Sequence, residues 1–478
     1  MALYTRTSPI LPALLLTSCA AVGPDYARPA PTALQADGPY RAASEAAARP
    51  APPVDLATWW RGFNDPLLSA LVERAAAQNL DLAAAAARLD RAAAAARLAG
   101  AQLLPSVGVD ASAAVSRQSL ESGIGRIARN APGFDRTSSS YAVGTAASWE
   151  LDLFGGLRRG RQAAQADLGA AQAEVAGARV AVVAEVADAY LQVRLLQRRI
   201  DVLRQQVNNA ERLDRLVDLR FAAGIVARQE TDRTNAQAQQ FRAALPLLEA
   251  LLLVQMNRLD VLMGAAPGTH RAELQRPGNI PAAPGIATAQ GPVELLRRRP
   301  DIVAAERRLA AASARIGEAV AEYYPKVSLS GLLGFDALGA GRLLSGDAAV
   351  ASGVLGLRWR LFDFGRIDAA VAAARGTERE ALVAYRQSVL RALEDVENGL
   401  SALVRRVAQA RALAEAETSL RRARASVGTG YTAGVTSLVE VLDVERQLLA
   451  TQDEVAQAQG EASRAAVATF RALGGGWS

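Results

Sequence analysis

The chain carries one pattern of segments twice, and this internal duplication restricts its fold more than any other feature. Residues 79–112 align with residues 299–332 at an offset of 220. From "SWELDLFGG" (148–156) and "RWRLFDFGR" (358–366) onward the offset is 210, so one connection is ten residues shorter in the second half. Because all features keep the same order in both halves, the sequence predicts a tandem duplication of one unit.

Each unit begins with a helical pattern, predicted over about 66–103 and about 292–323. It ends at a Leu-Pro or Tyr-Pro step, because the residue before proline is disfavoured in the α region. The period then changes to two, which predicts a pair of strands. Segments of this length are long enough for tilted strands that cross a membrane, but the strands of a soluble β-sandwich would show the same alternation. The alternating apolar positions include Val107, Val109, Val115, Tyr141, Val143, Trp149, Val327, Leu329, Leu333, Phe335, Leu355, Leu357 and Trp359.

Two tracts without proline, about 155–219 and about 365–427, decide between these alternatives. A continuous helix of this length would be roughly 100 Å long, whereas a globular helix averages about 12 residues. The contact positions of these tracts are mostly alanine with scattered Leu and Val, so each helix would have narrow apolar seams on more than one side. This pattern favours helices that pack side by side into a wall over a plain coiled coil. Each tract is predicted to end at a glycine turn, Gly224 or Gly434. Returning helices follow over about 229–262, interrupted and kinked at Pro246, and about 438–472.

Four predicted strands per chain have a consequence for assembly. A sheet inside a membrane must have no free edge, and the smallest membrane barrels have about eight strands. If the strands lie in a membrane, several chains must therefore share one barrel.

The N-terminus predicts a lipid anchor. An apolar run over 10–16 ends at Leu16, and the stretch Leu16-Thr17-Ser18-Cys19, which contains the only cysteine, resembles a bacterial lipobox. The alternatives are an ordinary signal peptide or a buried thiol. Ala20, rather than aspartate, follows the cysteine, and this favours sorting to the outer membrane. No later run is apolar for long enough to form a transmembrane helix.

The charge and the catalytic residue types exclude several classes of protein. The net charge is +6, but basic and acidic residues alternate along the helical tracts, which favours solvated helix faces over a nucleic-acid surface. The single histidine, His270, lies in the linker and is expected to be a surface loop residue. The sequence has no pairs of Cys or His residues that would predict a zinc site. The glycine-rich stretch 331–342 lacks the lysine pattern of a P-loop. We expect no catalysis, no cofactor and no metal.

Several motifs together resemble a known family: "VGPDYARP", "WWRGFNDPLL", "SWELDLFGG", "LLRRRPDIVAAERRL", "AEYYPKVSLSG", "WRLFDFGR" and "VGTGYTAGVTSLVEVLDVERQLL". They are similar to the TolC/NodT-type outer-membrane efflux factors, in particular the lipoprotein branch that serves RND-type multidrug pumps. The resemblance implies a mixed α and β fold, in which a homotrimer forms a twelve-stranded β-barrel continuous with a long α-helical periplasmic barrel, plus a small equatorial region. It places the chain in the bacterial outer membrane, anchored by lipid, with a large periplasmic part.

The resemblance also implies a function. The chain would be a passive exit duct that carries drugs or other small toxic compounds from an inner-membrane RND-type pump and a periplasmic adaptor to the exterior. The alternatives are the duct of a type I protein secretion system, a copper- or silver-efflux duct, a structural coiled-coil lipoprotein and a lipid-anchored enzyme. The predicted parts are a signal peptide (1–18), a lipid-anchored extended segment (19–64), a first repeat (65–264), a linker or equatorial region (265–291), a second repeat (292–473) and a tail (474–478).

The candidate functional residues lie beside the glycine turns. Glu440 and Asp443 share one helix face, and in a trimer facing the lumen they would form rings of carboxylates that favour cations. The family resemblance assigns the entrance constriction to these two positions, the matching acidic position to Glu230, and a tip aromatic to Tyr431. Some members carry a basic residue where this chain has Thr436. The alternative is an exposed polar helix face.

The two turns themselves are the second candidate site. Glycine allows a positive φ there, and the flanking apolar side chains would be exposed. The resemblance implies that they contact the adaptor, and simple helix caps are the alternative. The residues are Arg220, Phe221, Gly224, Ile225, Val226, Gly434 and Val435.

Overall fold

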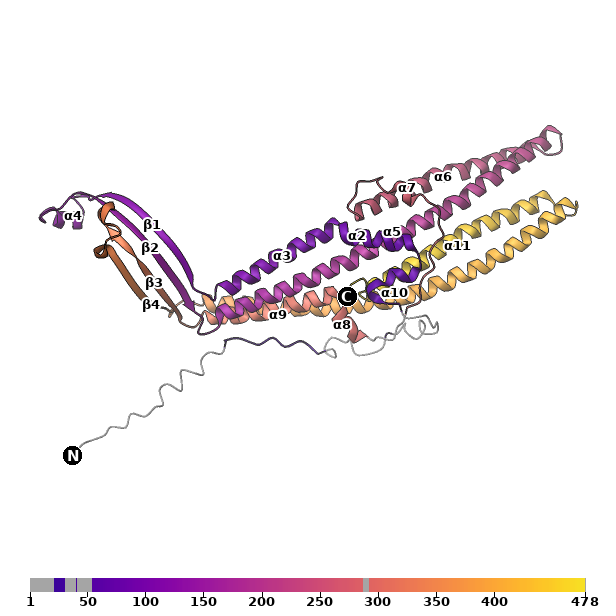
Figure 1. Cartoon of the computed structure of the whole chain (residues 1–478). Helices are drawn as coiled ribbons and strands as arrows, with labels where there is room; N and C mark the ends of the chain where they lie inside the picture. The colour runs from indigo at the N-terminus through magenta and orange to yellow at the C-terminus, as the bar shows by residue number, and fades with distance from the viewer. Residues whose placement is uncertain (1–20, 31–39, 41–53, 287–291, 478) are drawn as a thin grey trace, which may run out of the picture. The chain divides into compact units, whose positions relative to one another are not determined.

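The chain divides into two compact units, each built from several stretches of the sequence. The computed structural model describes residues 21–30, 40, 54–286 and 292–477 (Figure 1). The first unit combines 90–169 and 307–383 with the N-terminal stretch up to Arg28, and the second combines 29–89, 170–306 and 384–478. Cys19 and the predicted signal peptide lie outside the described residues.

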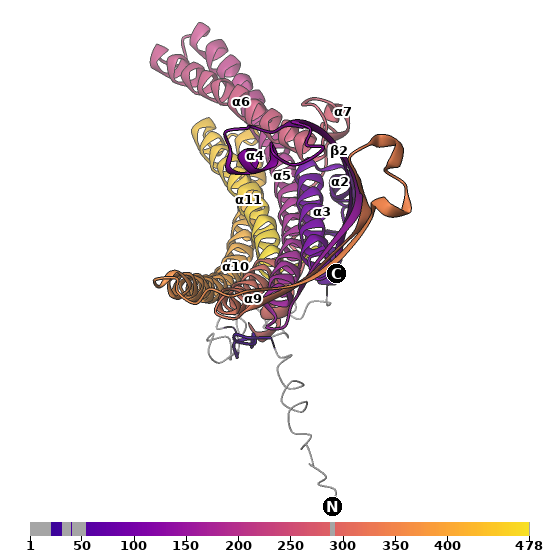
Figure 2. The same ribbon diagram turned by 90° about the vertical axis from the view of Figure 1, so that its left-hand side faces the viewer.

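The first unit contains one antiparallel sheet in the order β1 (Ser106–Arg117), β2 (Thr137–Leu151), β3 (Lys326–Ala337) and β4 (Ala349–Arg358). The sheet is curved (Figure 2). Ser106 pairs with Ser148 in the first hairpin and Lys326 with Arg358 in the second, so the two registers are the same after the offsets of 220 and 210. The second connection is shorter than the first, which contains α4 (Gly123–Ala128). These observations confirm the predicted hairpins and their duplication.

The sheet has one apolar and one polar face. Val109 lies opposite Thr145, which lies opposite Leu333, so the odd-numbered residues of all four strands share a face. Most large apolar side chains on this face are exposed, and no second sheet of the chain covers it within the described residues. The predicted alternation is therefore confirmed, and the soluble β-sandwich is wrong for this chain because a sandwich buries the apolar face between two sheets. The opposite face carries small and polar side chains such as Ser106, Asp110 and Ser330 around a cavity of about 420 Å³.

A buried arginine holds the first described residues against this unit. The Arg159 guanidinium donates hydrogen bonds to the backbone carbonyls of Val22 (3.0 Å) and Gly23 (3.2 Å) and forms an ion pair with Asp25 (2.9 Å). The Val22 N–H donates to the carbonyl of Phe154 at 3.0 Å. Residues 21–25 are thus fixed beside the start of α5 (Gly156–Ala222).

The two long helices, α5 and α10 (Arg366–Thr432), have 67 residues each, which confirms the predicted tracts. At 1.5 Å per residue each is roughly 100 Å long. Their partners, α6 (Arg228–Leu262) and α11 (Leu438–Ala472), have 35 residues each and return beside them as two helical hairpins (Figure 1). Among the described residues, no helix has both the length and the hydropathy needed to cross a bilayer.

The predicted interruption of α6 at Pro246 is wrong, because the helix is continuous through it. A proline removes one backbone hydrogen bond, and the bonds on both sides remain available. Leu248 packs in a buried cluster with Leu196 and Ile200 of α5, and Leu245 and Leu252 pack against this cluster. This burial offsets the cost of the proline.

The predicted single helices at the start of each repeat are also wrong, because both are broken. The first consists of α2 (Pro66–Gln78) and α3 (Leu80–Ala101), and the second of η3 (Pro292–Glu294), α8 (Leu295–Arg298) and α9 (Pro300–Ala321). The breaks at Asn79 and Arg299 are 220 residues apart, so the duplication includes them.

Each break has a local cause. Asn79 is extended, and its side chain accepts hydrogen bonds from the N–H groups of Asp81 (2.9 Å) and Leu82 (3.0 Å), which starts a new helix. Arg299 precedes Pro300 and is pushed into the extended region.

Ion pairs and hydrogen bonds join the two hairpins inside the second unit. Arg199 of α5 pairs with Asp453 of α11 at 2.7 Å, and Arg464 of α11 pairs with Asp188 of α5 at 2.6 Å. Near the tips, Asn209 donates to Glu445 at 2.9 Å. These contacts fix α11 along α5.

An aromatic cluster fills the core of the second unit. Trp59, Trp60 and Phe63 of η2 (Leu56–Phe63) are buried, and Trp59 stacks on Phe470 of α11 with ring centroids 5.1 Å apart. This short helix lies within residues 19–64, which were predicted to be extended. The spacing of its aromatic residues places them on the same side of the helix, where they are buried.

Candidate functional site

The first glycine turn joins α5 to α6. Gly224 has φ +71, its N–H donates to the carbonyl of Phe221 (2.8 Å), and the N–H of Ile225 donates to the carbonyl of Arg220 (2.9 Å). This pair of bonds is a Schellman motif, which requires a left-handed residue at the position of Gly224. The predicted turn is therefore closed by main-chain bonds.

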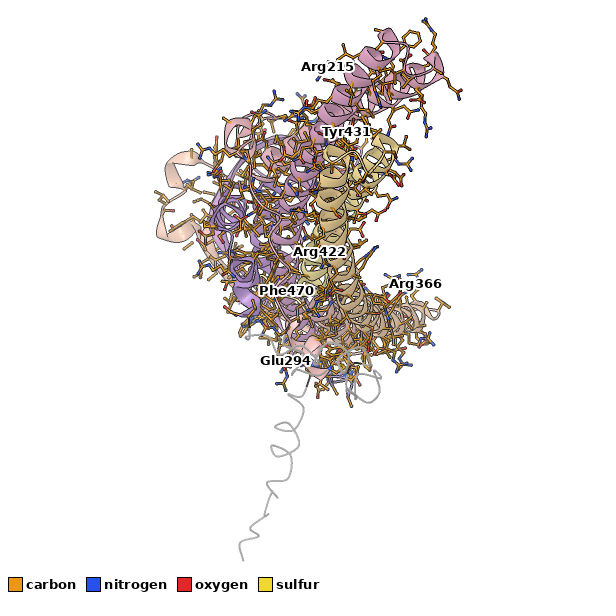
Figure 3. The ribbon with its side chains drawn as sticks, turned by 90° about the vertical axis from the view of Figure 1, so that its right-hand side faces the viewer. Arg215, Glu294, Arg366, Arg422, Tyr431 and Phe470 are labelled. Atoms are coloured by element: carbon orange, nitrogen blue, oxygen red, sulfur yellow. The ribbon has the colours of Figure 1, made fainter. Side chains whose placement is uncertain are left out.

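The second turn, from α10 to α11, has the same structure. Gly434 has φ +75, its N–H donates to Tyr431 (3.0 Å), and Val435 donates to Gly430 (2.9 Å). Tyr431 lies on the last turn of α10 (Figure 3). Thr436 donates its backbone N–H to the same Gly430 carbonyl at 3.3 Å.

The predicted apolar anchors are at the surface of both turns. Ile225 is 64% exposed and Val435 is 82% exposed. Phe221 is partly exposed, and the guanidinium of Arg228 lies over its ring at 6.0 Å. An exposed aliphatic side chain beside a closed turn is available to a partner at little conformational cost.

Glu440 has a local role that the sequence analysis missed. Ser437 is the N-cap of α11, and its hydroxyl accepts a hydrogen bond from the Glu440 N–H at 3.2 Å. The Glu440 carboxylate in turn accepts from the Ser437 N–H at 2.8 Å, which completes a capping box. These bonds, from the Ser437 backbone first and then from its hydroxyl, hold the pKa of the Glu440 carboxyl below its usual value. The Ser-x-x-Glu spacing is the sequence signal that would have identified it.

Asp443 lies one turn further along α11 and has different partners. Its carboxylate accepts from Arg446 at 2.8 Å and from Gln447 at 2.7 Å. Within one chain, therefore, the charge of Asp443 is paired with an arginine on its own helix.

Glu230 is the counterpart of Glu440 in the first repeat, but its surroundings differ. It lies in the first turn of α6, whose N-cap is Ala227, a residue without a side-chain cap. The offset of 210 aligns Ala227 with Ser437, so the capping box exists in only one of the two repeats.

A cavity brings part of the predicted site together. It has a volume of about 260 Å³ and lies between α5, α6 and α11. Glu230 and Asp443 line it beside three arginines, and Phe241 and Leu449 are among its apolar residues. Of the predicted tip residues, Val226 and Arg220 (one of these arginines) line it, whereas Glu440, Tyr431 and the two glycines do not. The cavity depends on residues from distant segments, so the sequence analysis missed it.

His270 differs from the expected surface residue. It is partly buried, and its Nδ1 lies 2.7 Å from Oδ1 of the fully buried Asp260. Asp260 also accepts from the backbone N–H groups of Gly268 (2.7 Å) and His270 (3.1 Å). The buried Asp260 carboxylate therefore holds the loop after α6, and His270 is one of its partners. Among the described residues, no group of three His, Cys, Asp or Glu side chains is placed to hold a metal.

Comparison with known proteins connects this architecture to a family. The sequence model of the outer membrane efflux protein family matches residues 71–265 and 291–475, which is once in each repeat. Nodulation protein T of Rhizobium leguminosarum bv. trifolii is 32% identical over 99% of this chain and 98% of its own length. The pyoverdine export outer membrane protein OpmQ of Pseudomonas putida is 35% identical over 88% of each chain.

Solved structures show the same fold. The outer-membrane channel OprN is 34% identical, with a TM-score of 0.84 over 95% of this chain and 99% of that chain. The outer membrane protein VceC of Vibrio cholerae is 26% identical, with a TM-score of 0.77 over 88% of this chain and 99% of that chain.

The chain belongs to the outer membrane efflux protein family. Its fold is the mixed α and β, tandem-duplicated fold of the outer-membrane efflux channels. It is an outer-membrane protein that serves as the channel component of an efflux system, and its family consists of ducts rather than enzymes.

Proposed function

We propose that three copies of the chain form a passive exit duct that carries drugs or other small toxic compounds across the outer membrane. The observation that supports this most is the four-stranded sheet, whose apolar face is exposed and whose outer strands β1 and β4 have no partner within the described residues. Three such sheets would give a twelve-stranded barrel with no free edge, which a membrane requires.

The energy and the cargo would come from partners. We propose a periplasmic adaptor and an inner-membrane RND-type pump, because two of the relatives are named as outer membrane proteins of efflux pumps. Relatives carry names for pyoverdine export and for toluene efflux, which are both transport of small organic molecules. This supports a small organic cargo over a secreted protein.

The entrance would lie at the helical tips. Glu440 and Asp443 would each contribute three carboxylates to a ring, and such rings favour cations and resist the passage of anions. Glu230 and Tyr431 would complete the constriction. Arg446 pairs with the Asp443 carboxylate within one chain. The net charge of the ring would therefore depend on whether this ion pair is formed or broken, which supports a regulated site.

The two Schellman turns would contact the adaptor. Their exposed apolar residues Ile225 and Val435 would be anchors, with Val226, Phe221 and Arg220 beside them. Gly224 and Gly434 would fix the turn geometry. We also propose that Cys19 carries the lipid and that the parts of the chain follow the boundaries predicted from the sequence.

The first test is the mass of the native protein extracted in detergent from isolated outer membranes. We expect about three times 50.1 kDa, less the signal peptide, after correction for detergent. A monomer that is extracted without detergent would exclude the shared barrel and the duct.

The second test measures single-channel conductance and cation preference in planar bilayers. Glu440→Gln combined with Asp443→Asn should weaken the preference for cations, because both rings lose their charge. Glu454→Gln is the matched control, since it removes one exposed carboxylate from the same helix away from the tip. Equal cation preference in the double variant and the control would exclude the proposed constriction.

A further inference from the structure

The cavity between α5, α6 and α11 has a largely apolar lining. Val217 of α5 and Leu449 of α11 are buried there, and Leu213, Phe241 and Leu442 lie beside them. The ring of Phe241 also packs against a buried cluster of leucine and isoleucine side chains from α5 and α6, which holds it in place. Pockets for drug-sized ligands have volumes of about 300–1,000 Å³, so a cavity of about 260 Å³ suits a smaller molecule with one or two rings.

Two of the three carboxylates that line this cavity already have partners. Asp443 accepts a hydrogen bond from Arg446 at 2.8 Å. Glu445 accepts a hydrogen bond from Asn209 at 2.9 Å and forms an ion pair with Arg424 at 3.4 Å. The negative charges of these two carboxylates are therefore largely compensated within the chain.

The other charged residues of the lining leave an excess of positive charge. Arg220, Arg233 and Glu230 all line the cavity, and none of them forms an ion pair within the described residues. Two guanidinium groups thus stand against one carboxylate. A guanidinium is a planar donor that can form two parallel hydrogen bonds to a carboxylate. The lining is therefore complementary to a molecule that combines an apolar ring with a single negative charge.

The second repeat does not contain these two arginines. The offset of 210 aligns Arg220 with Gly430 and Arg233 with Asp443. The long helix, the glycine turn and the returning helix nevertheless have the same lengths and the same geometry in both repeats. The fold therefore does not require cations at these positions, and their presence in one repeat only favours a role in binding over a role in folding.

We propose that this cavity binds a small aromatic carboxylate, with its ring against the apolar lining and its carboxylate against Arg220 and Arg233, and that the bound molecule holds the two helical hairpins together. The lining comes from both hairpins, because α5 and α6 form the first and α11 belongs to the second. A ligand that contacts both shifts the equilibrium toward the arrangement in which they lie side by side. The proposal rests on the proposed duct and adds a ligand that acts on its tips.

Binding is measured by fluorine NMR, with a fluoronaphthoate as the probe and the full-length protein in lipid nanodiscs. Empty nanodiscs give the signal of probe that partitions into lipid. We expect a Kd of about 1 mM for a molecule of this size. The corresponding fluoronaphthamide has the same rings but no charge, so it should bind about tenfold more weakly. Equal affinities for the two probes would overturn the assigned class of ligand.

Three variants locate the site. Arg220→Gln with Arg233→Gln should weaken fluoronaphthoate binding about tenfold and leave fluoronaphthamide binding unchanged. Arg198→Gln with Arg212→Gln is the matched control, since it removes two exposed arginines of α5 that do not line the cavity. Leu213→Trp fills the apolar part of the cavity and should abolish the binding of both probes. Unchanged binding in Leu213→Trp, or equal losses in the two arginine pairs, would exclude this cavity as the site.

Amide exchange tests the effect on the hairpins. With fluoronaphthoate bound, exchange should slow in the first turns of both α6 and α11, because both hairpins contact the ligand. Protection of α6 without protection of α11 would overturn the bridging role. The outcomes also separate this proposal from the proposed function. A trimeric native mass without fluoronaphthoate binding would exclude the site and leave the duct intact, whereas binding to a protein of monomeric mass would exclude the duct and support the site.

Discussion

Replacing Arg159 by methionine should release residues 21–25 from the first unit. The guanidinium is buried and donates to the carbonyls of Val22 at 3.0 Å and Gly23 at 3.2 Å. A hydrogen bond to a charged group contributes about 1.5–3 kcal/mol. One lost bond would raise the opening constant of the segment roughly tenfold, and two would raise it more than about a hundredfold, since each 1.4 kcal/mol is a factor of ten.

The Val22 amide is the reporter, because its N–H is bonded to the carbonyl of Phe154 at 3.0 Å. Hydrogen exchange, read at this amide by mass spectrometry with electron-transfer fragmentation, should accelerate by at least tenfold in Arg159→Met. Asp25→Asn is the matched control. The Asp25 side chain is 93% exposed, so its ion pair with Arg159 contributes less than about 1 kcal/mol. An unchanged exchange rate in Arg159→Met, or an equal acceleration in Asp25→Asn, would refute the carbonyl clamp.

Three further predictions concern helix ends. Asn79→Ala removes two cap bonds and the buried bond to the Leu262 carbonyl (2.8 Å), so the free energy of unfolding should fall by about 2–3 kcal/mol; an unchanged thermal unfolding temperature would contradict this. Gly434→Val should destabilise the tip by about 1–2 kcal/mol because φ is +75, and faster amide exchange at the tip checks it. The bonds from Ser437 hold the pKa of the Glu440 carboxyl below its usual value, so the capping bond should be fully present above the usual glutamate pKa and be lost as the pH falls through the lower folded pKa. An NMR titration of this carboxyl measures the shift, which Ser437→Ala should reduce, because the variant removes the hydroxyl bond and leaves the bond from the backbone N–H.

Local patterns were sufficient for the larger elements of the fold. The lengths of α5 and α10 follow from tracts without proline, and the turns follow from Gly224 and Gly434. The duplication added independent support, because each signal occurs twice. The strand alternation was visible for the same reason, since the large apolar residues recur at odd positions in all four strands.

Features that depend on a single polar side chain or on distant contacts were missed. The break at Asn79 depends on a side-chain cap, and helix-forming neighbours conceal it in the sequence. The break at Arg299 has a sequence signal in the following Pro300, because the residue before a proline is disfavoured in the α region. Pro246 remains inside α6 because the packing around Leu248 outweighs its local preference, and such packing has no local sequence signal.

The candidate site was only partly predictable. Glu230 and Asp443 do line one cavity, but the cavity itself comes from three helices that are far apart in the sequence. Glu440 was selected for its charge, whereas in the chain its carboxylate caps α11. The roles of these residues in gating stay predictions.

In the two Schellman turns, the main chain determines the geometry of the tips, and the exposed side chains determine their surface chemistry. Both turns are closed by main-chain bonds, and only Gly224 and Gly434 need a left-handed backbone. The side chains of Ile225 and Val435 are exposed, and the main-chain bonds that close the turns do not involve them. In the proposed contact with the adaptor, substitution at these positions would change which partner is recognised while the corner remains the same, so related ducts would diverge in their partners without rebuilding the helices that carry them.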